Sequence, residues 1–275
     1  MIDEKEVQKV FLDMLLKLDE VCERHGLRYY LAYGTCIGAV RHKGFIPWDH
    51  DIDVLMPVRD AWKLIRYQKE FGDRYFVQNK KTDPEFGSIS FKLRDSETAC
   101  VWEEYRHLHY NQGLGIDIYP FYEAPRTKPG LLINIWRSHI YRALAKGNTP
   151  VEHGGFFEKL TAVLQKLYPG ERGERKMKKI RHQLAAVRNG KEILDYYGQD
   201  ISLCSAITYP KEWFGEPKKM EFEGHMLNGP TEPEKYLTRR YGDFMTLPPE
   251  DKRTNDLDVP GVIIDTKKSY REYLL

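Results

Sequence analysis

Apolar and polar residues alternate with different periods along the chain, and these periods predict where its helices and strands lie. Residues 3–25 carry apolar side chains at every third or fourth position, a spacing typical of an amphipathic helix that ends near Gly26. Short apolar runs bounded by turn residues follow. We expect strands over residues 27–34, 48–56, 74–80, 89–95, 98–105 and 113–122. Helices over residues 36–40 and 58–72 separate the first three strands.

After Pro125 the pattern becomes helical. Three amphipathic stretches predict helices over residues 131–146, 156–168 and 174–189, and aromatic-rich mixed segments follow them. The strands stop where this pattern begins. We therefore expect a catalytic core over residues 1–125 and a helical and mixed C-terminal part over residues 126–275, packed on the core as one structural unit.

Composition narrows the class of protein. With 275 residues, 41% of them hydrophobic, the chain can bury a sizeable core as one large domain or two small ones. Its four cysteines are scattered without a CxxC pair, which disfavours a zinc site and indicates reduced thiols. The N-terminus is charged and lacks the apolar segment of a signal peptide, and no apolar run approaches the length of a membrane span. We expect a cytoplasmic protein.

The formal net charge of +2 conceals one strongly basic segment. Residues 126–191 contain 15 Lys or Arg, 4 Glu and no Asp. Such a surplus suits an anionic membrane face, a polyanionic glycan or a nucleic acid. Because its charges lie on helices that also need apolar faces, a solvated amphipathic surface explains them slightly better. We expect no nucleic-acid partner, and peripheral contact with the inner membrane face is the functional alternative.

The strongest chemical signal is the spacing of Asp49, Asp51 and Asp53. Residues two apart on a strand point to the same face, so a strand over residues 48–56 would line three carboxylates along one side. Like charges so placed repel, and a cation relieves the repulsion. An exposed acidic edge strand or a structural calcium loop would also gather aspartates, but the alternating apolar residues need burial. We interpret this stretch as a divalent-metal site for phosphoryl chemistry.

Asp117 is a further candidate metal ligand. It lies between Ile116 and Ile118 in an expected strand, and a lone carboxylate among apolar neighbours is unfavourable unless it is coordinated or neutralised. If this strand lies beside the strand of Asp53, Asp117 supplies the missing carboxylate of the metal site.

Small residues and a lysine near these aspartates predict phosphate contacts. Gly34 and Thr35 would let backbone N–H groups approach a phosphate at the start of a helix. Lys92 alternates with Arg94, so the two share a strand face, where Lys92 would bind a phosphate or pair with the acidic cluster. Charged residues are common on sheet surfaces, which makes this signal weak by itself.

A basic stretch, Arg41-His42-Lys43, separates Thr35 from the aspartates. These side chains would meet phosphate oxygens, Arg41 with a bidentate geometry. A solvated basic turn explains the same residues equally well. Aromatic residues suggest a cage for a quaternary ammonium group, but with 18 Tyr and 5 Trp the sequence does not locate it. The candidates are Trp48, Tyr105, Tyr110, Tyr119, Tyr122, Trp213 and Tyr241.

The chain resembles the LicD family (LicD/fukutin-type phosphotransferases) in three segments, LAYGTCIGAVRHKGFIPWDHDIDVLM, GIDIYPFY and YLTRRYGDFMTLPP. The likeness runs from the first expected helix to about residue 250, which is nearly the whole chain. Where the family usually has PWDDDID, this chain has His50. On a strand, residue 50 points away from the flanking aspartates, so we expect the metal ligands to be intact.

The resemblance implies an α/β (α+β), nucleotidyltransferase-like fold with a central mixed sheet flanked by helices. It also implies a phosphotransferase that moves a phospho-alcohol, phosphocholine in the first instance, from CDP-choline or a related CDP-alcohol to a hydroxyl of a glycan or lipid-linked glycan, with release of CMP. Teichoic acid and lipopolysaccharide are acceptors in the family, and relatives move ribitol phosphate. Mg²⁺ is the expected cofactor, with Mn²⁺ as the alternative ion.

On this hypothesis Asp51, Asp53 and Asp117 hold the metal, and Asp49 orients it or binds a second ion. Asp117 or Asp49 takes the proton of the attacking hydroxyl. Six residues are expected to bind the donor: Gly34, Thr35, Arg41, His42, Lys43 and Lys92. Two other functions are open, namely a nucleotidyltransferase that adds NMP and releases pyrophosphate, and a non-catalytic glycan- or lipid-binding module. The repulsive aspartate cluster disfavours the module.

Overall fold

The computed structural model describes residues 4–146, 156–196, 201–202, 204–250, 253 and 260–275. Its helices are α1 (Glu4–His25), α2 (Tyr33–Arg41), α3 (Val58–Leu64), α4 (Lys128–Lys146), α5 (Phe156–Leu167), α6 (Glu171–Ala185) and α7 (Pro233–Tyr241). Its strands are β1 (Tyr30–Leu31), β2 (Asp53–Pro57), β3 (Tyr75–Gln78), β4 (Phe91–Asp95), β5 (Ala99–Trp102), β6 (Gly115–Glu123), β7 (Glu192–Asp195), β8 (Tyr209–Pro210), β9 (Lys218–Phe222), β10 (His225–Gly229) and β11 (Val262–Asp265).

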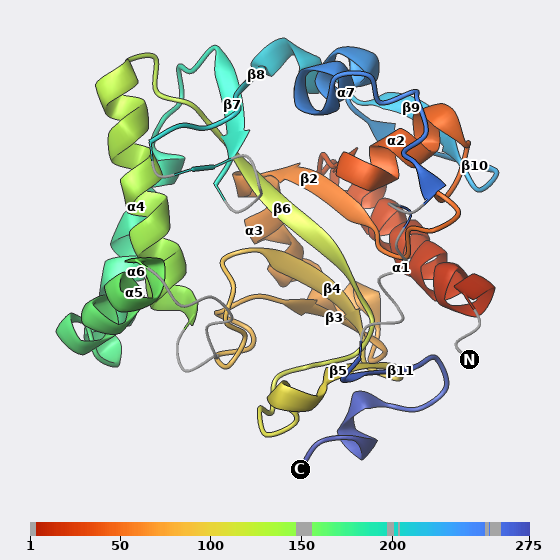
Figure 1. Cartoon of the computed structure of the whole chain (residues 1–275), viewed down its shortest axis with the longest axis horizontal. Coiled ribbons are helices and arrows are strands. Elements are labelled where there is room, and N and C mark those ends of the chain that lie inside the picture. The colour runs from red at the N-terminus through yellow and green to blue at the C-terminus, as the bar shows by residue number, and fades with distance from the viewer. Residues whose placement is uncertain (1–3, 147–155, 197–200, 203, 251–252, 254–259) are drawn as a thin grey trace.

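A seven-stranded sheet forms the centre of the described structure (Figure 1). Its main path runs β1-β2-β6-β4-β3, and β7 and β8 extend it from β6. The central pair β2 and β6 is parallel, whereas the other pairs are antiparallel. The sheet is therefore mixed, and the predicted α/β class is confirmed.

Helix α1 packs on β4 and β6, and α3 packs on β2 and β6. The buried face of α1 has the three- and four-residue spacing seen in the sequence, and it consists of Val7, Val10, Phe11, Met14, Leu15, Leu18, Val21 and Cys22. The helix predicted over residues 3–25 is confirmed. Figure 1 shows α4, α5 and α6 grouped on one side of the central sheet, and α2 and α7 grouped beside the β9–β10 hairpin.

Two strands next to the candidate aspartates are shorter than predicted. The strand expected over residues 27–34 is reduced to β1, because the chain turns into α2 at Tyr33. The strand expected over residues 48–56 begins only at Asp53. Its antiparallel partner β1 ends at Leu31, opposite Val54, and its parallel partner β6 pairs with it from Asp53 onward.

The helices predicted after Pro125 are confirmed as α4, α5 and α6, but the prediction that strands stop there is wrong. β7 pairs with β6 in the central sheet, and β8 pairs with β7. β9 and β10 form a hairpin, and β11 pairs with β5. These late strands are only two to five residues long, too short for an apolar pattern to indicate them.

Apolar side chains gather in two main clusters within the described residues. The larger lies between α1, the central sheet, α2 and α7, and the second joins α4 and α6 to β7. No helix in the described part of the chain is long and apolar enough to cross a membrane.

Candidate functional site

A pocket of about 450 Å³ opens where α2 begins and β2 begins. Its walls come from α2, the loop before β2, β6, α4 and α7. The described residues that line it are Tyr33, Gly34, Asp49, Asp51, Asp53, Tyr119, Arg142, Ile201, Arg240 and Tyr241. The structure therefore brings Gly34 and three of the predicted aspartates to one cavity.

Three neighbouring strands place the remaining predicted acid and a lysine in one row. Asp53 of β2 pairs in register with Asp117 of β6, and Asp117 pairs in register with Lys92 of β4. The Nζ of Lys92 donates a hydrogen bond of 2.6 Å to Oδ2 of Asp117. The prediction that the strand of Asp117 lies beside that of Asp53 is confirmed, and Lys92 is the cation that balances Asp117.

The prediction that Asp49, Asp51 and Asp53 share one strand face is wrong for the first two. Asp49 and Asp51 precede β2 and belong to the loop that leads into it. A turn in which the Asp49 N–H donates to the Ile46 carbonyl, at 2.9 Å, begins this loop. All three aspartates nevertheless line the pocket, so the loop achieves what strand alternation was expected to do.

His50 lies between two pocket aspartates in the sequence but is directed elsewhere. Its side chain is buried, and its Nε2 lies 3.6 Å from the Glu4 carboxylate on α1. The prediction that residue 50 points away from the aspartates is confirmed. The departure from the usual family sequence therefore falls outside the pocket.

Negative charge is concentrated in this pocket. Asp51 lies among crowded protein atoms yet stays open to solvent through the pocket, and this crowding, followed by the charges of Asp49 and Asp117, raises its pKa to about 8. Burial and then the same neighbours raise the pKa of Asp53 well above its usual range. Lys92 acts in the opposite direction on both groups. More carboxylates are gathered here than the local lysine can neutralise.

The donor set has the chemistry of a site for a hard divalent cation. Carboxylate oxygens are the preferred ligands of Mg²⁺, and the mutual repulsion of these aspartates is what a cation would relieve. Within the described residues, however, no three acidic, histidine or cysteine side chains form a ready-made ligand shell. Asp49 and Asp51 share a hydrogen bond, and Asp117 is held by Lys92. The residues fit the ion in charge and ligand type, and coordination would require these contacts to open.

Gly34, which lines the pocket, and Thr35, which lies behind it, both position the aspartates. A Cβ atom on residue 34 would lie only 2.5 Å from Oδ2 of Asp49, so any other residue here would displace that carboxylate. Thr35 is buried, and its Oγ1 accepts a hydrogen bond of 2.9 Å from the N–H of Asp53. Thr35 thus holds the first residue of β2, while its predicted part in donor binding stays a prediction.

The basic residues Arg41, His42 and Lys43 are not among the described residues that line the pocket. Nη1 of Arg41 donates to the Phe244 carbonyl at 2.6 Å, and the Lys43 carbonyl accepts from the Glu223 N–H at 2.8 Å. Burial lowers the pKa of Arg41 and of His42. These contacts fasten the loop to the hairpin turn and the segment after α7, and phosphate binding by the three residues stays a prediction.

Sequence reasoning did not identify three further residues that line the pocket, namely Tyr33, Arg142 and Arg240. It named Tyr119 and Tyr241, which also line the pocket, only among the aromatic residues of a cage that it did not locate. Arg240 and Tyr241 belong to the YLTRRYGDFMTLPP segment, so the resemblance could have directed attention to them. Arg142 lies on α4 in the basic segment and carries no local signal. Helix packing alone brings it to the aspartates.

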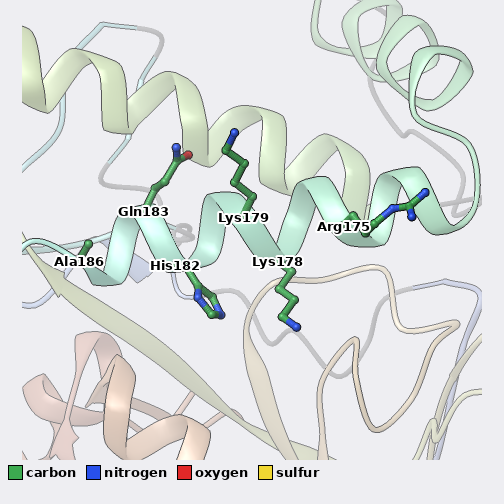
Figure 2. Close-up of a pocket in the computed structure, with 6 residues that line it drawn as sticks. All are labelled: Arg175, Lys178, Lys179, His182, Gln183 and Ala186. Carbon is green, nitrogen blue, oxygen red and sulfur yellow. The ribbon is translucent and has the colours of Figure 1, made fainter.

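A second, shallow hollow of about 480 Å³ lies on α6, far in sequence from the aspartates (Figure 2). One helical stripe lines it, formed by Arg175, Lys178, Lys179, His182, Gln183 and Ala186. Figure 2 shows Lys178 and His182 extending to one side of the helix and Lys179 and Gln183 to the other. Its four basic side chains are exposed, so part of the basic surplus forms one coherent face.

Comparison with known protein sequences identifies a matching family and several relatives of this chain. The sequence matches the family described as LicD/FKTN/FKRP, nucleotidyltransferase domain, over residues 26–145. It is 30% identical over 265 residues to the lipopolysaccharide cholinephosphotransferase LicD of Haemophilus influenzae, covering 90% of this chain and 93% of that relative. The human ribitol 5-phosphate transferase FKRP is 33% identical over 107 residues, which are 37% of this chain and 18% of FKRP. The mouse FKRP matches to the same extent.

Proposed function

The chain belongs to the LicD family, and from this premise we propose that it is a phosphotransferase that moves phosphocholine from CDP-choline to a hydroxyl of a glycan. The observation that carries the proposal is the gathering of Asp49, Asp51 and Asp53 in one pocket, with Asp117 in register beside Asp53. Such a cluster is unfavourable in a simple binding module, because like charges repel, but it suits a site that holds a cation and phosphates.

We assign a nucleotidyltransferase-like fold to the chain. The family that matches residues 26–145 is described as a nucleotidyltransferase domain. The parallel pair β2–β6, which carries Asp53 and Asp117 at opposed positions, supports the same assignment.

The cofactor we propose is Mg²⁺, with Mn²⁺ as the alternative ion. Asp51, Asp53 and Asp117 would hold it, because their carboxylates supply the hard oxygen ligands that these ions prefer. When bound, the ion would neutralise charge on the donor's phosphates and make CMP a better leaving group. In the absence of the ion, Lys92 would neutralise the charge of Asp117.

The transfer exchanges one phosphorus–oxygen bond for another. The acceptor's hydroxyl oxygen bonds to the phosphorus of phosphocholine, and the bond from that phosphorus to CMP breaks with its electron pair leaving on CMP. We assign removal of the hydroxyl proton to Asp49, which lines the pocket. Asp117 is less suited to this step, because its Oδ2 already accepts a hydrogen bond from Lys92.

The relatives support our choice of alcohol and acceptor. The enzyme named as a lipopolysaccharide cholinephosphotransferase aligns along nearly its whole length, which favours choline and a lipopolysaccharide-like or other surface glycan as the pair. The match to FKRP covers only 37% of this chain and 18% of FKRP, so ribitol phosphate is the second choice. Glycerol phosphate is a further CDP-linked alternative.

The decisive experiment mixes the protein, Mg²⁺ and a lipopolysaccharide acceptor with CDP-choline, CDP-ribitol or CDP-glycerol in turn. Release of CMP that depends on the acceptor supports phospho-alcohol transfer, and the fastest donor identifies the alcohol. Release of pyrophosphate from an NTP, without CMP release from any CDP-alcohol, would replace the proposal with nucleotidyl transfer. Binding of the glycan without either product would indicate a non-catalytic module.

We also propose that the cytoplasmic face of an anionic membrane is a peripheral partner of the chain. The basic stripe of α6 supplies charge, and the neighbouring helix α4 exposes Leu132, Ile133 and Trp136. A soluble polyanion needs only the charges, whereas exposed large apolar side chains also suit the acyl boundary of a bilayer. Such contact would bring a lipid-linked acceptor close to the enzyme.

A further inference from the structure

Tyr33 stands at the wall of the pocket in an unusual backbone conformation. Its φ is 48°, in the left-handed region, where a bulky residue is rare and persists only when its surroundings hold it. Its N–H donates to the Tyr236 hydroxyl at 3.2 Å, and its own hydroxyl donates to the buried Asp195 carboxylate at 2.9 Å. Its ring packs edge-on against Tyr119, with centroids 5.4 Å apart. The ring is therefore fixed in one orientation.

Arg240 lies on this fixed ring. Its Cζ is 4.4 Å from the ring centroid of Tyr33 and 5.2 Å from that of Tyr241. Both distances are within cation–π range, so the two rings hold the guanidinium carbon while its N–H donors radiate outward in the guanidinium plane. Because Arg240 lines the pocket, the fork of donors is oriented at the pocket wall by an element that the surrounding protein holds rigid.

Arg142 lines the same pocket from α4, so the cavity has two kinds of charged residue. Asp49, Asp51 and Asp53 surround the start of β2, and the two guanidiniums come from helices α4 and α7. Carboxylates repel a phosphate, while a guanidinium can bind two of its oxygens at once. A ligand with a diphosphate would therefore bind with its charged group toward the two arginines.

We propose that Arg240 and Arg142 form the subsite for the diphosphate of a nucleotide donor, and that Tyr33 is a positioning residue that holds Arg240. The inference rests on the proposed function for the identity of the ligand. The face of Tyr33 that carries Arg240 is then not open to a quaternary ammonium group.

Binding of CDP and of cytidine, measured by calorimetry with Mg²⁺ present, tests the subsite without relying on turnover. Arg240→Gln should weaken CDP binding about 10- to 100-fold, the range for losing charge-assisted hydrogen bonds, and leave cytidine binding unchanged. Arg142→Gln should also weaken CDP binding and leave cytidine binding unchanged. Arg239→Gln, an exposed neighbour on α7, is the matched control and should leave both affinities unchanged.

Tyr33 is tested by keeping or removing its ring. Tyr33→Phe retains the ring face and should preserve the preference for CDP over cytidine. Tyr33→Leu removes the ring face and should reduce this preference toward the value measured for Arg240→Gln. A purely structural role would alter both ligands together. Thermal unfolding of each variant verifies that the pocket is folded.

The outcomes separate the subsite from the proposed function. If the wild type releases no CMP from any CDP-alcohol yet Arg240→Gln selectively loses CDP binding, the subsite stands and the transfer reaction fails. If the wild type transfers phosphocholine and Arg240→Gln binds CDP normally, the subsite is overturned and the function stands. A wild-type protein that does not bind CDP more tightly than cytidine overturns the subsite whatever its activity.

Discussion

The hydroxyl oxygen of Thr35 accepts a hydrogen bond of 2.9 Å from the backbone N–H of Asp53. This contact joins α2 to the first residue of β2, eighteen positions further along the chain. It links Gly34-Thr35 with the aspartate stretch, and these are the two segments that indicate phosphoryl chemistry in the sequence. The geometry of Asp53 therefore depends on a side chain that does not line the pocket itself.

Thr35→Val should damage both the fold and the activity. The substitution leaves the N–H of Asp53 without its acceptor, which costs about 1–3 kcal/mol for a buried donor. The resulting displacement of Asp53 should reduce CMP release about 10- to 100-fold, a loss expected for a shift near 1 Å. Thr35→Ser keeps the hydroxyl and should retain most of the activity. Equal activity in the Val and Ser variants would contradict this role, and thermal unfolding with an initial-rate assay measures both effects.

Asp53→Asn should separate stability from activity. Transfer should fall by several orders of magnitude, because a proposed metal ligand is lost. The metal-free protein should nevertheless unfold at a higher temperature, by about 2–4 °C for each kcal/mol, because an uncharged amide avoids the burial cost and the repulsion that raise the pKa of Asp53. Mg²⁺ should raise the melting temperature of the wild type and have much less effect on the variant.

Asp73→Asn provides the control for this experiment. Asp73 is exposed and lies outside the pocket, so the substitution should change neither activity nor the response to Mg²⁺. A fully active Asp53→Asn variant would remove the metal assignment. A variant that is less stable than the wild type without metal would show that repulsion does not dominate at this position.

Much of the fold was predictable because its signals are local. The apolar spacing of residues 3–25 predicted α1 within one residue at the N-terminus, and Ile116 and Ile118 marked the strand of Asp117. The aspartate cluster was also visible, although the sequence could not show that Asp49 and Asp51 lie in a loop. A strand requires a backbone partner, and the end of β1 is determined by the turn into α2 rather than by the residues of the cluster.

The remainder of the pocket depends on contacts between distant parts of the chain. Arg142 and Arg240 lie 89 and 187 positions after Asp53, and no spacing rule relates residues on separate helices to a strand. The same holds for Tyr33, whose hydroxyl meets Asp195 162 positions away. Short strands such as β7 were missed for a related reason, because pairing with β6 decides their structure.

Lys92→Met should reveal competition between the lysine and the proposed metal for Asp117. The Lys92–Asp117 pair is largely shielded, with side chains 22% and 17% exposed. Its loss should destabilise the metal-free protein by about 1–3 kcal/mol, below the value for a fully buried pair. The melting-temperature rise caused by Mg²⁺ should then be larger than in the wild type, because no lysine has to be displaced.

Lys17→Met is the comparison for Lys92, since Lys17 pairs with Glu20 on the surface. It should change neither the stability of the metal-free protein nor the effect of Mg²⁺. A smaller Mg²⁺ effect in Lys92→Met than in the wild type would contradict the competition, because it would show that Lys92 helps to hold the Asp117 carboxylate in place for the ion. Titration of Mg²⁺ followed by thermal unfolding distinguishes these outcomes.

The double variant Lys178→Gln/Lys179→Gln should weaken binding to anionic vesicles. Each lysine near an anionic surface contributes about 1 kcal/mol, so losing both should reduce partitioning about 30-fold. Co-sedimentation with phosphatidylglycerol vesicles at low salt measures the effect, and neutral phosphatidylcholine vesicles should bind little. Lys69→Gln/Lys218→Gln removes two exposed lysines from other elements and should bind like the wild type.

Trp136→Ser distinguishes a membrane from a soluble polyanion as the partner of α6. Trp136 is 38% exposed on α4, which packs against α6. Insertion into a bilayer uses its apolar ring, so the variant should bind anionic vesicles more weakly and a soluble phosphate-rich glycan unchanged. If the lysine variants lose glycan binding while no variant alters vesicle binding, the basic stripe serves the acceptor glycan and the membrane proposal is wrong. Salt should weaken both interactions, because each depends on the same lysines. Only vesicle binding should persist in part at high salt, because insertion of the apolar ring does not depend on charge.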